Sequence, residues 1–216
     1  LAALTTKQVV VMETDDLQAV TTAQLVAMTT AQVASFTTDQ VVALITGQIA
    51  NLKTAQIAAL TTAQVAAMEI ADMAALSTAQ VTVLNTTQVA ALTAGMVTAM
   101  STGQVAAMTT AQVASLTTAQ MASLSNDQIA KLGTQQVQSL TTTQLNALSA
   151  DQVAAVETAD IAALTTAQIG ALSAAQVGKV PTAGIGAMST AQIAALTTAQ
   201  VAVLSSARVL RIKRTR

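Results

Sequence analysis

Apolar side chains return at a fixed interval of eight residues along the chain. Counted from Leu4, 26 octads run to Arg211 without an insertion or a deletion. The first position of the octad is Leu, Met, Val or Phe in all 26, and the sixth is Val, Ile, Leu or Met in all 26. A period kept over so many units is typical of repeat architectures, in which neighbouring units bury one another's apolar side chains.

The stretch Leu60–Ala67 shows what each octad is expected to form. Thr61 is followed three residues later by Gln64, which is a capping box. In that motif the hydroxyl accepts from a backbone N–H of the first helical turn, and the Gln side chain reaches back to the N–H of the cap residue. Leu60 and Val65 have the spacing of a hydrophobic staple around the cap. Since position 5 is Gln in 20 octads and position 2 is Ser or Thr in 18, each octad predicts the start of a short helix.

Two other folds compete with this interpretation. In one continuous helix, eight residues advance by roughly 800°, so the apolar stripe would rotate by about 80° at each repeat. A β-solenoid is the stronger rival, because Val, Ile and Thr favour strands. Position 6 and the next position 1 lie three residues apart, however, which is one face of a helix but opposite faces of a strand. We therefore predict an all-α solenoid or superhelix of very short capped helices, one per octad, with the β-solenoid as the alternative.

The pattern assigns structural roles to particular residues. Where position 2 lacks a hydroxyl, as at Ile45 and Gly133, the following Thr46 or Thr134 is expected to act as the cap instead. The representative helix caps are Thr61, Gln64, Thr109, Gln112, Thr165, Gln168, Thr197 and Gln200. The representative core residues are Leu60, Val65, Met108, Val113, Leu164, Ile169, Leu196 and Val201.

Composition removes most kinds of chemistry. The chain has one Phe and no His, Cys, Tyr or Trp. It therefore lacks disulfides and thiolates, the commonest general base and metal ligands, and aromatic platforms for stacking. We expect no catalytic residue, no cofactor and no metal, and we predict that the protein is not an enzyme.

Three octads carry acids at both position 2 and position 5, as Glu69 and Asp72 do. Carboxylates in a first helical turn complement the helix dipole, which is the favoured explanation. A calcium site is the weaker alternative, because no segment resembles an EF-hand loop.

Hydropathy and the N-terminal residues bear on two further features, a membrane-spanning helix and the start of the repeat array. The mean hydropathy is +0.57, but Thr and Gln interrupt every octad, so no apolar run has the eighteen or more residues that a membrane-spanning helix needs. The opening residues Leu1, Ala2 and Ala3 fit positions 6 to 8 of a preceding octad, and there is no initiating Met. We therefore expect no membrane span, and we expect the chain to begin inside a longer array.

The last nine residues depart from the repeat. We divide the chain into an octapeptide-repeat solenoid, residues 1–207 with the last octad running to Arg211, and a basic tail or cap, residues 208–216. The tail carries +5, whereas residues 1–207 carry four Lys and ten acids, hence −6. A solvated terminus, a cap or an electrostatic contact with another acidic subunit is preferred over nucleic-acid binding. The basic residues of the tail are Arg208, Arg211, Lys213, Arg214 and Arg216.

Two families share the motif. The stretch Leu-Thr-Thr-Ala-Gln-Val-Ala-Ala at residues 60–67 is similar to the helix opening of TAL-effector repeats, but those units are far longer and carry base-reading residues that this acidic chain lacks. Over nearly its whole length the chain more closely resembles Thr-Ala-Gln octapeptide arrays of very large bacterial secreted or cell-surface proteins. That resemblance implies an extracellular or cell-surface location and a role as a spacer, adhesin stalk or matrix filament.

Together these features predict a structural or assembly protein. A uniform array exposes apolar ends, so we expect a homo-oligomer or end-to-end self-association. The alternative is a surface-binding module in which regular rows of Thr recognise ice or a polysaccharide. Nucleic-acid binding through the tail is the least favoured hypothesis.

Overall fold

The protein is an all-α repeat structure. A computed structural model describes residues 1–204, which form 24 helices of five or six residues, followed by helical residues at 198–204, and contain no strand. The chain divides into two compact units, residues 1–115 and residues 116–216. The prediction of a solenoid of very short helices, one per octad, is confirmed, and the β-solenoid alternative is wrong.

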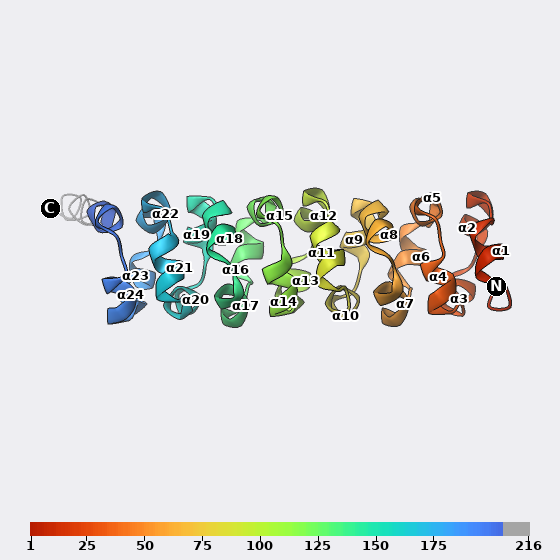
Figure 1. Ribbon diagram of the computed structural model, residues 1–216, viewed down its shortest axis with the longest axis horizontal. Helices are drawn as coiled ribbons and strands as arrows, with labels where there is room; N and C mark the ends of the chain where they lie inside the picture. The colour runs from red at the N-terminus through yellow and green to blue at the C-terminus, as the bar shows by residue number, and fades with distance from the viewer. Residues whose placement is uncertain (205–216) are drawn as a thin grey trace. The chain divides into compact units, whose positions relative to one another are not determined.

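The helices follow one another at intervals of one octad in both units (Figure 1). The first unit contains α1 (Thr6–Val10), α2 (Thr14–Ala19), α3 (Thr22–Val26), α4 (Thr30–Ala34), α5 (Thr38–Ala43), α6 (Thr46–Ala50), α7 (Thr54–Ala59), α8 (Thr62–Ala67), α9 (Ile70–Ala75), α10 (Thr78–Thr82), α11 (Thr86–Ala91), α12 (Ala94–Ala99), α13 (Thr102–Ala107) and α14 (Thr110–Ser115). The second unit contains α15 (Thr118–Ser123), α16 (Asn126–Ala130), α17 (Thr134–Ser139), α18 (Thr142–Ala147), α19 (Ala150–Ala155), α20 (Thr158–Ala163), α21 (Thr166–Ala171), α22 (Ala174–Lys179), α23 (Thr182–Ala187) and α24 (Thr190–Ala194), followed by helical residues at 198–204.

Helix α8 shows why the residues of an octad form one short helix. Thr61 is extended, with φ −72° and ψ 161°, and its hydroxyl accepts from the Gln64 N–H at 3.2 Å. The helix stops at Met68, which is again extended with φ −56° and ψ 149°. The Met68 N–H donates to the Val65 carbonyl at 3.3 Å, closing the last turn. A helix this short is unstable alone, so its stability must come from packing.

The direction of the chain changes without any left-handed residue. No residue between 1 and 204 has a positive φ, glycine included. After a six-residue helix such as α7, the reversal is made by its C-cap and the N-cap of the next helix, two neighbouring extended residues such as Leu60 and Thr61. Extended backbone suits β-branched side chains. The repeat can therefore place Thr at its turns and does not need a glycine in each octad.

Within each unit, helices stack on those three positions further along the chain. In the first unit α1 packs against α4, α2 against α5 and α8 against α11; in the second unit α18 packs against α21 and α19 against α22. Throughout the described part of each unit, helix pairs in contact are always three apart. Three octads therefore make one superhelical turn.

Each octad position has a characteristic burial. In the octad that begins at Leu60, Leu60 is 4% exposed, Val65 is fully buried and Gln64 is 2% exposed. Thr61 at position 2 is exposed. The core is thus a thin layer of one aliphatic side chain from position 1 and one from position 6, with a buried amide beside them.

Two of the predicted core residues are not buried, so their assignment was wrong. Val201 is 46% exposed and Leu196 is half-buried. Leu196 and Val201 belong to the octad directly before residue 205, where the described residues end.

The expectation that a Thr at position 3 replaces a missing cap was also wrong. Ile45 and Gly133 themselves are the N-cap residues of α6 and α17, without a side-chain cap hydrogen bond, and Thr46 and Thr134 are the first helical residues. Moving the cap by one residue would shift positions 5 and 6 out of phase with the neighbouring turns. The packing between turns therefore determines where the helix begins, even where the local cap is lost.

Removing one whole octad should leave the fold intact. Deletion of residues 61–68 removes no charge and keeps positions 5 and 6 in phase, so we expect a cooperative thermal transition with helix content per residue unchanged by circular dichroism. Deletion of residues 61–64 removes half an octad and puts the segments on either side out of phase. That variant should lose helix content and melt far lower; equal behaviour of the two deletions would contradict the phase argument.

Candidate functional site

The described residues offer little conventional site chemistry. Residues 1–204 contain no group of three or more His, Cys, Asp or Glu side chains that could hold a metal ion. None of the helices described here has the length and apolar character required to cross a membrane. The most regular polar feature is instead the row of Gln side chains at position 5 of the octad.

Gln64 uses both ends of its amide. Its Oε1 accepts from the backbone N–H of Thr61 at 2.6 Å, which completes the capping box of α8. Its Nε2 donates to the carbonyls of Val33, Ala34 and Phe36, at 3.2, 3.2 and 2.7 Å. These three residues lie at the end of α4 and just beyond it, one turn earlier in the solenoid. One side chain thus joins the start of one helix to the end of another.

The same contact recurs at the same sequence separations in both units. Gln48 and Gln104 donate to carbonyls 31, 30 and 28 residues earlier in the first unit, and Gln152 and Gln168 do so in the second. We call this row of position-5 amides the glutamine ladder. Its members between Gln32 and Gln200 are buried, whereas Gln8 and Gln24, in the first turn, are exposed.

The ladder solves the main hydrogen-bonding problem of short helices. A helix of six residues leaves most of its N–H and C=O groups without partners inside the helix. The position-5 amide accepts from one of the N–H groups at the start of its own octad and donates to the carbonyls at the end of an earlier one. Buried polar groups need such partners, because an unpaired one costs about 1–3 kcal/mol. The buried amide is therefore satisfied at both ends.

The structure places the predicted cap residues at helix starts. The hydroxyls of Thr61, Thr109, Thr165 and Thr197 accept from the N–H groups of Gln64, Gln112, Gln168 and Gln200, at 3.2, 3.2, 3.1 and 3.3 Å, and each of these Gln side chains accepts from the N–H of its Thr at 2.6 to 2.8 Å. Of the predicted core residues, Leu60, Val65, Met108, Val113, Leu164 and Ile169 are at most 5% exposed. Arg208, Arg211, Lys213, Arg214 and Arg216 lie outside the described residues.

Reasoning from the sequence missed the donor half of the ladder. It treated Gln only as the acceptor of a capping box, a role that Glu fills equally well. Glu, however, never occurs at position 5 in the 26 octads. A carboxylate would supply the acceptor for the cap N–H but no donor for the carbonyls of the preceding turn. The absence of Glu was therefore the signal that an amide N–H₂ was needed there.

Five octads in the described units interrupt the ladder. Position 5 is Asp16, Asp72, Met96, Asp160 or Gly184. Met96 is 1% exposed and Asp72 and Asp160 are 1% and 5% exposed, so these side chains occupy the same buried position as Gln. Asp160 accepts from the Thr134 hydroxyl at 2.7 Å. The stacking thus tolerates the occasional loss of a ladder amide.

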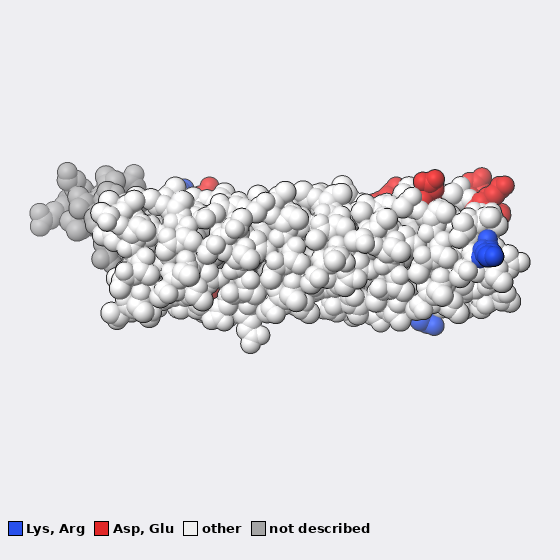
Figure 2. Space-filling model, in the orientation of Figure 1, with Lys and Arg blue, Asp and Glu red and all other residues white. Residues whose placement is uncertain are grey.

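Charged side chains are sparse on the surface. The face shown in Figure 2 is mostly uncharged, with acidic atoms gathered over α2 and α5 of the first unit. In the second unit Lys179 Nζ lies 3.0 Å from Asp151 Oδ1, but the two side chains are 59% and 70% exposed. A pair so open to solvent contributes little to stability. The surface is therefore dominated by Thr and Ala rather than by ion pairs.

Replacing single Gln residues should separate the contribution of the helix cap to stability from that of the hydrogen bonds between turns. Gln64→Ala leaves several buried backbone groups without partners, so we expect it to lower the free energy of unfolding by at least about 2 kcal/mol. Gln24→Ala is the matched control, since Gln24 makes the same capping box with Thr21 but is exposed; it should cost about 1 kcal/mol or less. Urea unfolding followed by circular dichroism measures both values. Equal losses would show that the bonds between turns contribute nothing.

The repeat also identifies the family. No curated protein matches the sequence. The family model described as the ALTTAQ repeat matches residues 9–46, 42–69, 65–102, 97–134, 126–158, 153–179 and 180–209. These matches cover nearly all of the chain and follow the octads whose Thr, Gln and Val residues build the caps, the ladder and the core. The chain belongs to the ALTTAQ repeat family.

Proposed function

We propose that the protein is a structural scaffold, in which a stacked array of octads forms a spacer, stalk or filament and performs no catalysis. The observation that carries this proposal is the glutamine ladder. Each turn is joined to an earlier one by the same bonds, at separations of 28 and 31 residues, at Gln48, Gln104 and Gln176 alike. An array with this property lengthens by adding octads without a new kind of contact.

Self-association follows from the same equivalence of octads. Within the array a ladder amide donates to the turn before it: Gln32 is 3% exposed and donates to the Leu4 carbonyl at 2.6 Å. A second copy could supply carbonyls to such amides in the way that an adjacent turn does. We propose end-to-end association on this basis, and an extracellular or cell-surface location by the resemblance to bacterial surface arrays.

Electron microscopy and light scattering test the scaffold and its assembly. We expect negative-stain images to show rods whose length rises when three extra octads are inserted, by about 8–10 Å, the distance between packed helices. We also expect the molar mass from light scattering to rise with protein concentration. Rods of unchanged length would contradict the scaffold, whereas a constant monomer mass at all concentrations would contradict self-association alone.

A surface-binding role is the second candidate, and the exposed Thr rows favour it. Positions 2 and 3 are exposed along the array, as at Thr61 and Thr62, and recur with every octad, so a regular target such as ice or a polysaccharide would meet evenly spaced hydroxyls. Thermal hysteresis that is lost when Thr62 and its equivalents three and six octads further on, Thr86 and Thr110, are changed to Lys would support the ice version. Absence of hysteresis and of recrystallisation inhibition in the unmodified chain would contradict it.

Nucleic-acid binding through residues 208–216 remains the least favoured hypothesis, because the remainder of the chain carries −6. It requires binding that weakens with salt and disappears when residues 208–216 are deleted.

A further inference from the structure

Asp72 occupies a place where the repeat normally puts an amide. The side chain is 1% exposed, and its Oδ2 accepts from the Glu69 N–H at 3.0 Å, which is the capping half of the Gln role. Its Oδ1 is buried and has no hydrogen-bond partner among residues 1–204, where it is the sole side-chain nitrogen or oxygen of that kind. An unpaired buried carboxylate oxygen is costly, so something must compensate it.

The phase of the ladder identifies what Oδ1 faces. The Gln residues one octad before and after, Gln64 and Gln80, donate to the carbonyls of Phe36 and Leu52, each 28 residues earlier. The carbonyl 28 residues before Asp72 is that of Leu44, the C-cap residue of α5, which is 4% exposed. Gln64 also donates to the carbonyl of Val33, 31 residues earlier, and the residue 31 before Asp72 is Val41, in the last turn of α5. By the phase of the ladder, Asp72 therefore places an acceptor where the neighbouring octads place a donor to such carbonyls.

The aspartate side chain is one methylene shorter than Gln, so its oxygen stops short of those carbonyls. Asp160 in the second unit solves the same problem differently, because the Thr134 hydroxyl, 26 residues earlier, donates to its Oδ1 at 2.7 Å. The equivalent residue for Asp72 is Thr46, but the unpartnered state of Asp72 Oδ1 shows that its hydroxyl does not donate there. No hydrogen-bond donor among residues 1–204 therefore compensates this oxygen.

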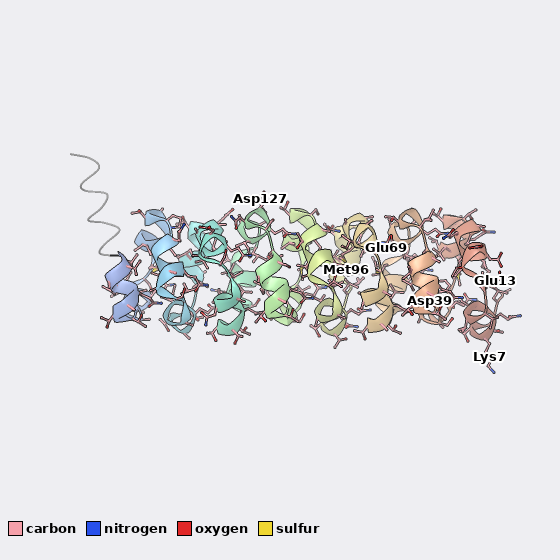
Figure 3. The ribbon with its side chains drawn as sticks, turned by 90° about the horizontal axis from the view of Figure 1, so that it is seen from above. Lys7, Glu13, Asp39, Glu69, Met96 and Asp127 are labelled. Atoms are coloured by element: carbon pink, nitrogen blue, oxygen red, sulfur yellow. The ribbon has the colours of Figure 1, made fainter. Side chains whose placement is uncertain are left out.

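We propose that Asp72 Oδ1 and the main-chain carbonyls of Val41 and Leu44 bind a small monovalent cation, sodium or potassium. All of these ligands are oxygens, which suit hard cations. The carbonyls belong to the end of α5, where the helix dipole favours positive charge. One buried carboxylate balances one positive charge, whereas a divalent ion would leave an uncompensated charge in the core. Glu69, labelled in Figure 3, is exposed at the start of α9, so solvent lies within one helical turn of the site.

The cation should stabilise the full chain in a way that depends on its size and on Asp72. We expect the Tm at neutral pH and constant ionic strength to be at least about 2 °C higher in sodium or potassium chloride than in tetramethylammonium chloride, whose cation is too large for the site. We also expect the protein to broaden the sodium NMR signal saturably, with potassium competing. Comparing the two salts shows which ion binds more tightly.

Two variants make the test specific. Asp72→Gln restores the ladder amide, so it should fold, keep a Tm at least as high as that of the unmodified chain in sodium, and lose both the salt preference and the NMR broadening. Asp160→Gln is the matched control and should retain both, because Asp160 already has a hydroxyl donor. Equal Tm values of the unmodified chain in all three salts, a response to calcium alone, or an unchanged response in Asp72→Gln would overturn the proposal.

Discussion

The structure depends on a single requirement: every short helix must find hydrogen-bond partners for both of its ends. A six-residue helix cannot supply them itself, and the chain exposes a new pair of ends with every octad. The primary amide of Gln meets the requirement because it is at once an acceptor and a donor. At Gln64 the oxygen takes the N–H of its own cap while the nitrogen reaches the carbonyls of Val33 and Phe36. One side chain therefore supplies both the cap of its own helix and the hydrogen bonds that join that helix to an earlier turn.

This dual role explains how a chain without Trp, Tyr or Cys can build a stable fold. Aliphatic burial per octad is small, because only positions 1 and 6, such as Leu60 and Val65, lie in the core. Each octad adds hydrogen bonds in a buried setting, and bonds there are stronger electrostatically than bonds in water. The repeated ladder also restricts how the turns can stack, since a slip of one residue would leave both the amides and the carbonyls unpaired. Specificity thus comes from polar contacts, whereas hydrophobic burial supplies most of the driving force.

The sequence was sufficient to predict the local structure but not the contacts between turns. The capping box at Thr61 and Gln64 and the three-residue step from Val65 to Met68 are short-range signals that need only one octad and the residue after it. The number of octads per turn depends on how far an extended pair such as Leu60 and Thr61 redirects the chain, which no local pattern reveals. The expected cap shift at Ile45 failed for the same reason: contacts with the preceding superhelical turn determine the helix start. The absence of Glu at position 5 was the one clue in the sequence to these contacts. It indicates that the side chain there must donate a hydrogen bond as well as accept one.

The octads that lack a ladder Gln show that each contact between adjacent turns contributes to stability separately. Contacts reach only to adjacent turns, so a lost amide weakens one junction and leaves the others unchanged, as expected of a quasi-one-dimensional fold. Met96 loses both halves of the Gln role and keeps only burial, whereas Asp72 keeps the acceptor half and adds a charge. The two substitutions therefore differ in kind: at Met96 the carbonyls of the earlier turn lose a donor, while at Asp72 they also face a second acceptor. The contact between turns at Met96 is therefore only weaker than a ladder contact. The contact at Asp72 is stable only when a cation balances the carboxylate. Asp72 is thus the place where an otherwise uniform array can respond to the ions around it.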